Sequence, residues 1–177
     1  MLSPAKVRSS RDSTRWATRV SSAAASTAWL QFDLGTLPAD TPGSQIEKAT
    51  LVLWAGSANN AQFDVRPVLS AWSEATLTAA LAPATGSIET SVSSVTENSF
   101  VTVDVTALVR RWLDGSQANF GLALTPPAGT TPFISFDTKE STTGSHAPAL
   151  LIQRAVTGLV GPMGPAGPQG LTGFQGP

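Results

Sequence analysis

The 177-residue sequence has no cysteine and no tyrosine, and its only histidine is His146. Without cysteine, the chain can form neither disulfide bonds nor thiolate metal sites. Tyrosine often lines binding surfaces because its ring is apolar and also hydrogen bonding. Its absence therefore weighs slightly against a rich sugar-binding surface.

Charged residues are also scarce: they make up 13% of the chain, and the formal net charge is −1. This balance provides no overall attraction to nucleic acid or to acidic membranes. The exception is a basic N-terminal arm, residues 1–11, together with Arg15 and Arg19 just beyond it. We expect these cations to be solvated or paired with nearby acids rather than bound to an anionic polymer.

Long apolar runs are missing as well. No window approaches the ~18 apolar residues that span a bilayer, and residues 1–20 lack the apolar core of a signal peptide. We therefore expect no membrane insertion. Serine, threonine, alanine and glycine take the place of the missing charges, a composition common in extracellular β-proteins. We expect an extracellular, cell-surface or particle-surface location.

Short apolar alternations, by contrast, are abundant between residues 28 and 154. Leu30 and Phe32 alternate with Gln31 and Asp33, for example, and similar runs end at glycine, proline or asparagine clusters. A period of two is typical of half-buried strands. The pattern predicts an all-β fold, an antiparallel β-sandwich of the jelly-roll type, over residues 12–157.

One segment between the expected strands, residues 105–112, has the apolar spacing of a helix. Asp104 can cap this helix and Gly115 can end it, and a second helical turn is expected within residues 73–80. The apolar residues spaced for one helix face are Val105, Leu108, Val109 and Trp112.

The last twenty residues, 158–177, place glycine at every third position. Only glycine fits the axis where three polyproline-II chains wind together, so the period predicts a collagen-like triple helix and a homotrimer. The chain stops within a repeat, and we expect a longer natural collagen region. The glycines are Gly158, Gly161, Gly164, Gly167, Gly170, Gly173 and Gly176.

Three apolar residues project opposite the expected core face: Trp29, Val52 and Trp54. Such a residue is covered by a loop, contacts a sugar or lies in a subunit interface. Because the glycine period requires three chains, we assign the three residues to the trimer interface.

Several stretches, in order, resemble the bacterial DNRLRE-type domain, a jelly-roll module grouped with carbohydrate-binding modules. The resemblance covers roughly residues 12–153 and implies a non-catalytic β-sandwich linked to secreted or cell-surface polysaccharide. The segment after Trp72-Ser-Glu lacks the tryptophan usual in that family, so no ligand site is carried over. The matching stretches are 29–38, 46–54, 68–78, 101–112, 119–124, 136–140 and 147–150.

Catalytic signals are weak. His146 lies in a turn sequence, and no spacing supports a Ser/His/Asp arrangement, so a solvated histidine is expected. Asp137 and Glu140 flank Lys139, which indicates an ordinary charged loop. We expect no enzyme and no cofactor; a structural calcium ion, which leaves little trace in a sequence, stays open.

Trp16, flanked by Arg15 and Arg19, is the candidate for sugar stacking; the alternative is that it packs as a lid. The leading hypothesis is a trimerisation and capping domain that nucleates and registers the triple helix of a bacterial collagen-like protein. The alternatives are a carbohydrate-binding module displayed on a collagen-like stalk, and a phage or spore fibre tip.

Overall fold

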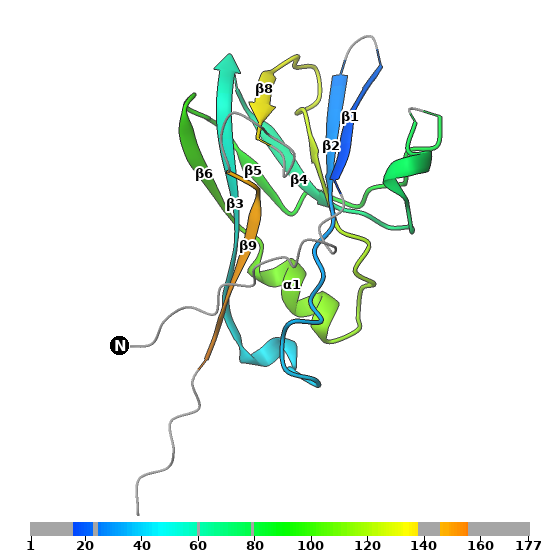
Figure 1. The fold of residues 1–177 in the computed structure, drawn as a ribbon, viewed down its shortest axis with the longest axis vertical. Helices are drawn as coiled ribbons and strands as arrows, with labels where there is room; N and C mark the ends of the chain where they lie inside the picture. The colour runs from blue at the N-terminus through cyan, green and yellow to red at the C-terminus, as the bar shows by residue number, and fades with distance from the viewer. Residues whose placement is uncertain (1–15, 23–24, 60, 79, 138–145, 156–177) are drawn as a thin grey trace, which may run out of the picture.

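The computed structural model describes residues 16–22, 25–59, 61–78, 80–137 and 146–155. They form two antiparallel sheets with an apolar core between them, and helix α1 (Thr106–Leu113) lies across one open end (Figure 1). The prediction of an antiparallel β-sandwich with a short helix is therefore confirmed. The seven tail glycines lie outside the described residues.

The first sheet has five strands in the order β1-β2-β7-β4-β5. The order brings β2 and β4, which are distant in sequence, onto either side of β7. The strands are β1 (Trp16–Ser22), β2 (Ala25–Leu30), β7 (Leu122–Thr125), β4 (Phe63–Pro67) and β5 (Thr90–Val92).

The second sheet is built around β3 (Ile46–Asn59), a strand of 14 residues. One edge of β3 pairs with β6 (Ser99–Asp104). Its other edge pairs first with β9 (Ala149–Arg154) and further along with β8 (Phe133–Phe136). β3 is therefore the strand to which every other strand of this sheet is hydrogen bonded.

The core follows the alternation of the strands. Leu51, Leu53 and Ala55 of β3 are fully buried between the sheets, whereas Val52 and Trp54, on the opposite face, are only partly buried. Phe32 and Leu122 lie in the same buried cluster.

Helix α1 ends as the sequence indicates, but its N-cap residue is Val105 rather than the predicted Asp104, and the Val105 side chain makes no capping hydrogen bond. The Asp104 carboxylate accepts a hydrogen bond from the Thr106 backbone N–H at 2.9 Å, just before the first turn. Hydrogen bonds from the Thr106 side chain and backbone lower the pKa of the Asp104 carboxyl below its ordinary value. At the other end, Gly115 has a φ of 72°, as expected for a residue that ends a helix. Leu108, Val109 and Trp112 are buried.

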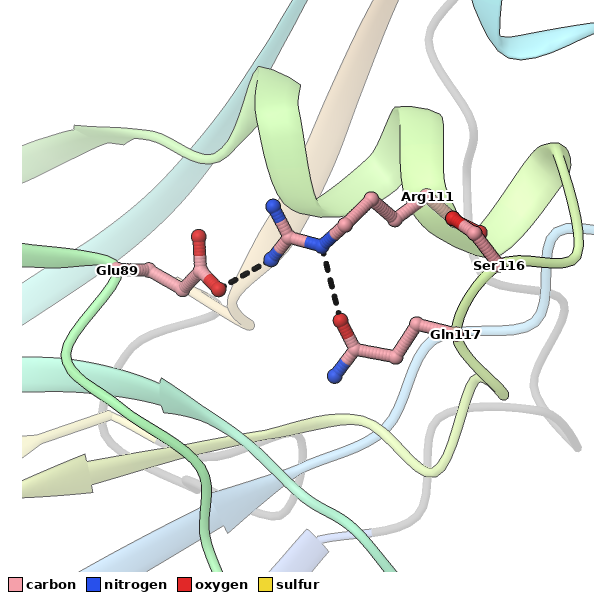
Figure 2. A network of polar contacts seen from close by, with 4 residues as sticks. All are labelled: Glu89, Arg111, Ser116 and Gln117. Carbon is pink, nitrogen blue, oxygen red and sulfur yellow. Dashed lines mark hydrogen bonds and ion pairs between the residues drawn. The ribbon is translucent and has the colours of Figure 1, made fainter.

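The last turn of α1 is tied to neighbouring loops by Arg111, whose guanidinium pairs with Glu89 before β5 and donates to the Gln117 amide oxygen at 2.9 Å (Figure 2). Ser116 Oγ donates to the Arg111 carbonyl oxygen. This network joins α1 to the segment that leads into the five-stranded sheet.

A second, smaller apolar cluster lies on the other face of the five-stranded sheet. Trp29, Val68 and Ala123 form its buried part, and Trp72 and Phe120 pack against it. Trp72 Nε1 donates to the Phe120 carbonyl oxygen at 2.8 Å. The second helical turn is present nearby as the short 3-10 helix η2 (Glu74–Thr76). A further short 3-10 helix, η1 (Gly43–Gln45), precedes β3.

The alternation of Phe120, Leu122 and Leu124 with smaller residues predicts that all three lie on one face of a strand. This is wrong for Phe120, which packs in the second cluster. Gly121 between them has a φ of 90°, which interrupts the strand period.

We predict that Gly121→Ala destabilises the fold more than Gly115→Ala. Both glycines have positive φ, where alanine is strained by about 1–2 kcal/mol. Only at Gly121 would the added Cβ meet backbone, 2.1 Å from the Leu30 carbonyl oxygen; at Gly115 it would meet nothing within 4 Å. Urea unfolding followed by circular dichroism measures both losses, and equal losses would contradict this account of Gly121.

Candidate functional site

The exposed aromatic residues of the four-stranded sheet gather on its outer face. Trp54 of β3 lies on that face because side chains alternate along a strand. Its cross-strand partner is Phe100 of β6, and their ring centroids are 4.8 Å apart at an interplanar angle of 71°. Phe100 is 57% exposed. Two strands therefore present an aromatic pair to solvent.

A third ring comes from the segment between β8 and β9. Phe136, the last residue of β8, pairs with Ala55, and Ala149, the first residue of β9, pairs with Val52. Trp54 therefore lies between the part of β3 that pairs with β8 and the part that pairs with β9. His146, just before β9, stacks on the Trp54 indole with centroids 4.2 Å apart and an interplanar angle of 16°.

Asp137 holds this arrangement at two points. Its backbone N–H donates to the Trp54 carbonyl oxygen at 3.1 Å, and its carboxylate Oδ2 lies 2.9 Å from His146 Nδ1. A proton on Nδ1 satisfies that contact and leaves Nε2 as a hydrogen-bond acceptor in the neutral ring. The imidazole is thus fixed both by stacking and by a carboxylate.

Trp54, Phe100 and His146 together form what we call the aromatic platform. Aromatic faces pack well against apolar C–H surfaces, and the polar edge of His146 can exchange hydrogen bonds. Val52 and Thr102 lie beside it on the same face. Such a surface can bind a ligand that has both an apolar face and hydroxyl groups.

The interface candidates fall in two different places. Val52 and Trp54 lie on the outer face, as the sequence predicts. Trp29 is only 4% exposed, and its ring centroid lies 6.3 Å from that of Trp72. The connection after β4 covers Trp29, so a single chain accounts for its burial.

Two of the sequence candidates for sugar stacking lie in a strand of the other sheet. Trp16 and Arg19 belong to β1, an edge strand of the five-stranded sheet, where Trp16 pairs with Leu30. The platform is on the other sheet. Arg15 lies outside the described residues.

The expectation of a solvated turn histidine is wrong. The His146 side chain is 36% exposed and is held by Trp54, Phe100 and Asp137. His146 stacks on Trp54, which is 92 residues earlier in the sequence. A local turn motif does not reveal a contact between residues so far apart. In the sequence, the signal for the outer face of the four-stranded sheet is that Trp54 and Phe100 both fall at outward positions of their strands.

Two further expectations concern metals and membranes. Within the described ranges, no three His, Cys, Asp or Glu side chains gather as a metal-binding group. In the same part of the chain, no helix is long and apolar enough to cross a membrane.

The fold and the exposed aromatic face define a β-sandwich binding module. Residues 10–154 match the model of carbohydrate-binding module family 96, so the chain belongs to that family. Its members are non-catalytic modules, in agreement with the expectation that this domain is not an enzyme. A search of curated proteins found no significant match.

Proposed function

We propose that this domain binds a polysaccharide through the aromatic platform. The observation that carries the proposal is the partly exposed Trp54–Phe100–His146 cluster on the outer face of the four-stranded sheet. Membership of a carbohydrate-binding family supports a sugar ligand. A pyranose ring offers an apolar C–H face for the rings and hydroxyl groups for the polar edge of His146.

The pairing of His146 with Asp137 serves binding rather than catalysis in this proposal. Among the described residues, the hydrogen bond that the His146 ring makes is to the Asp137 carboxylate, and it fixes the ring's orientation. The carboxylate fixes the imidazole, which lowers the entropy lost when a ligand binds.

A second function is supported by the glycine period of residues 158–177. We propose that this tail winds with two others, so that three binding domains are displayed together on a collagen-like stalk. β9 ends at Arg154, four residues before Gly158, so the sandwich leads directly into the tail. Linked sites gain avidity from effective concentrations in the millimolar range. Trimerisation would then strengthen three weak sugar sites.

This arrangement also suits a protein outside the cell or on the surface of a cell, spore or phage. A polysaccharide ligand is encountered there, and a stalk separates the binding domains from the surface that carries them. Val52 and Trp54 remain candidates for contacts between copies, in competition with the sugar.

Replacing Trp54 or Phe100 by alanine is expected to weaken polysaccharide binding about tenfold, or about 1.4 kcal/mol. Each change removes one ring of the platform while the buried core residues stay in place. The measurement is affinity gel electrophoresis of the full chain through soluble β-glucan, xylan, mannan, pectin and alginate.

Leu81→Ala is the matched control for these variants. Leu81 is 67% exposed, but it lies in the connection between β4 and β5, away from the four-stranded sheet. Its loss should leave retention unchanged. Retention of the two platform variants at the wild-type level would show that the sugar binds elsewhere, and no retention of the wild-type protein on any of the five gels would contradict a polysaccharide ligand.

The trimer is tested by light scattering at micromolar concentration. We expect the full chain to have three times its chain mass of 18.2 kDa. Residues 1–157 should remain trimeric if the sandwich itself nucleates the tail, and Trp54→Ser should then lower the mass. A monomeric 1–157 fragment would refute nucleation by the sandwich, and a monomeric full chain would refute the trimer altogether.

A further inference from the structure

The outer face of the four-stranded sheet has a second exposed aromatic position beyond the platform. Phe133, the first residue of β8, is 50% exposed and pairs with Asn59 at the end of β3. Its neighbours in β8 alternate, because Ile134 and Phe136 pack against the core while Ser135 is exposed. Phe133 therefore projects to the same outer face as Trp54, and the core does not account for it.

Hydroxyl and amide groups occupy the stretch between the two aromatic positions. Ser57 of β3 pairs with Ser135 of β8, and both are exposed. Asn59, exposed beside Phe133, follows on the same face. The register of β3 and β8 is irregular between Ala55 and Ser57, and beyond that irregularity the odd-numbered residues of β3 face outward. The face thus continues from the aromatic platform to Phe133 without a buried interruption.

The length of this stretch exceeds one sugar ring. Trp54 and Asn59 are five residues apart on β3, but the irregularity between Ala55 and Ser57 inserts one extra residue, so about four strand steps, or about 13 Å, separate them. A terminal monosaccharide seated on the platform would not reach Phe133. An extended chain of several rings would contact both.

The stretch of the sheet between the platform and Phe133 is polar but uncharged, which suits a chain of hydroxyl-bearing rings. In the described strands, no charged residue occurs in β3 from Gly56 to Asn59 or in β8 from Phe133 to Ser135. The exposed charged residues of the sheet lie at its other end: Glu47, Lys48, Asp104 and Arg154. A nucleic-acid strand would need cations along its path. Serine and asparagine side chains instead exchange hydrogen bonds with sugar hydroxyl groups.

We propose that Phe133 is a second aromatic subsite, and that this face binds an internal stretch of a polysaccharide chain laid along β3 and β8 from the platform to Phe133. The inference rests on the proposed function and deepens it: the ligand is an extended chain rather than a chain end. Binding then depends on chain length. Short oligosaccharides occupy the platform alone, and longer ones add the contact with Phe133.

The test uses isothermal titration calorimetry on the full chain. The probes are the disaccharide and the hexasaccharide prepared from whichever of the five polysaccharides retains the wild-type protein most strongly. Wild type should bind the hexasaccharide at least tenfold more tightly than the disaccharide. Phe133→Ala should lose most of that difference while its binding of the disaccharide stays at the wild-type level.

Two further variants keep the result interpretable. Phe133→Trp retains an aromatic ring and should retain the length preference, and Leu81→Ala should behave as wild type. Circular dichroism checks that each variant is folded. A wild-type length preference that survives in Phe133→Ala would overturn the second subsite, as would equal wild-type affinities for the two probes. Failure of the wild-type protein to bind any of the five polysaccharides would instead overturn the proposed function, and the subsite with it.

Discussion

The central constraint in this structure is the position of β3 between three partner strands. β6 pairs along one edge, and β9 and β8 share the other. A strand fixed in this way cannot slip by one residue without turning every side chain to the opposite face. Leu51 and Leu53 must therefore face the core, and Trp54 must face outward. The same alternation that builds the sandwich also exposes the aromatic platform.

The start of β3 is held by contacts outside the sheet. Arg110 of α1 donates two hydrogen bonds to the Ile46 carbonyl oxygen, at 3.0 and 2.6 Å. The Asp114 carboxylate accepts the Gly43 N–H at 2.7 Å, just before the strand begins. Helix α1 thus anchors the start of β3, while the site lies further along it. Two paired strands, β3 and β6, carry the Trp54 and Phe100 rings, and a loop residue, His146, completes the arrangement.

Much of the fold was predictable because it depends on local periods. The strand alternations, the hydrogen bond from the Thr106 N–H to Asp104 and the helix face from Leu108 to Trp112 all involve neighbours within a few residues. The site was predictable only in part. Outward projection marked Trp54 correctly, but the stacking of His146 depends on where β8 ends and β9 begins, which local sequence does not encode. For Trp29 the outward projection was also predicted, but a loop of the same chain covers the side chain, so it does not form part of an exposed site.

The central claim is that sugar binds on the outer face of the four-stranded sheet. Because His146 is the only histidine, its imidazole gives an unambiguous probe of that face. Nitrogen-15 NMR of the imidazole during titration with an oligosaccharide of the retained polysaccharide tests the claim most directly. The account predicts that the His146 ring signals and the Trp54 indole signal shift together with saturation. Saturable shifts confined to other residues, with His146 and Trp54 unmoved, would contradict it.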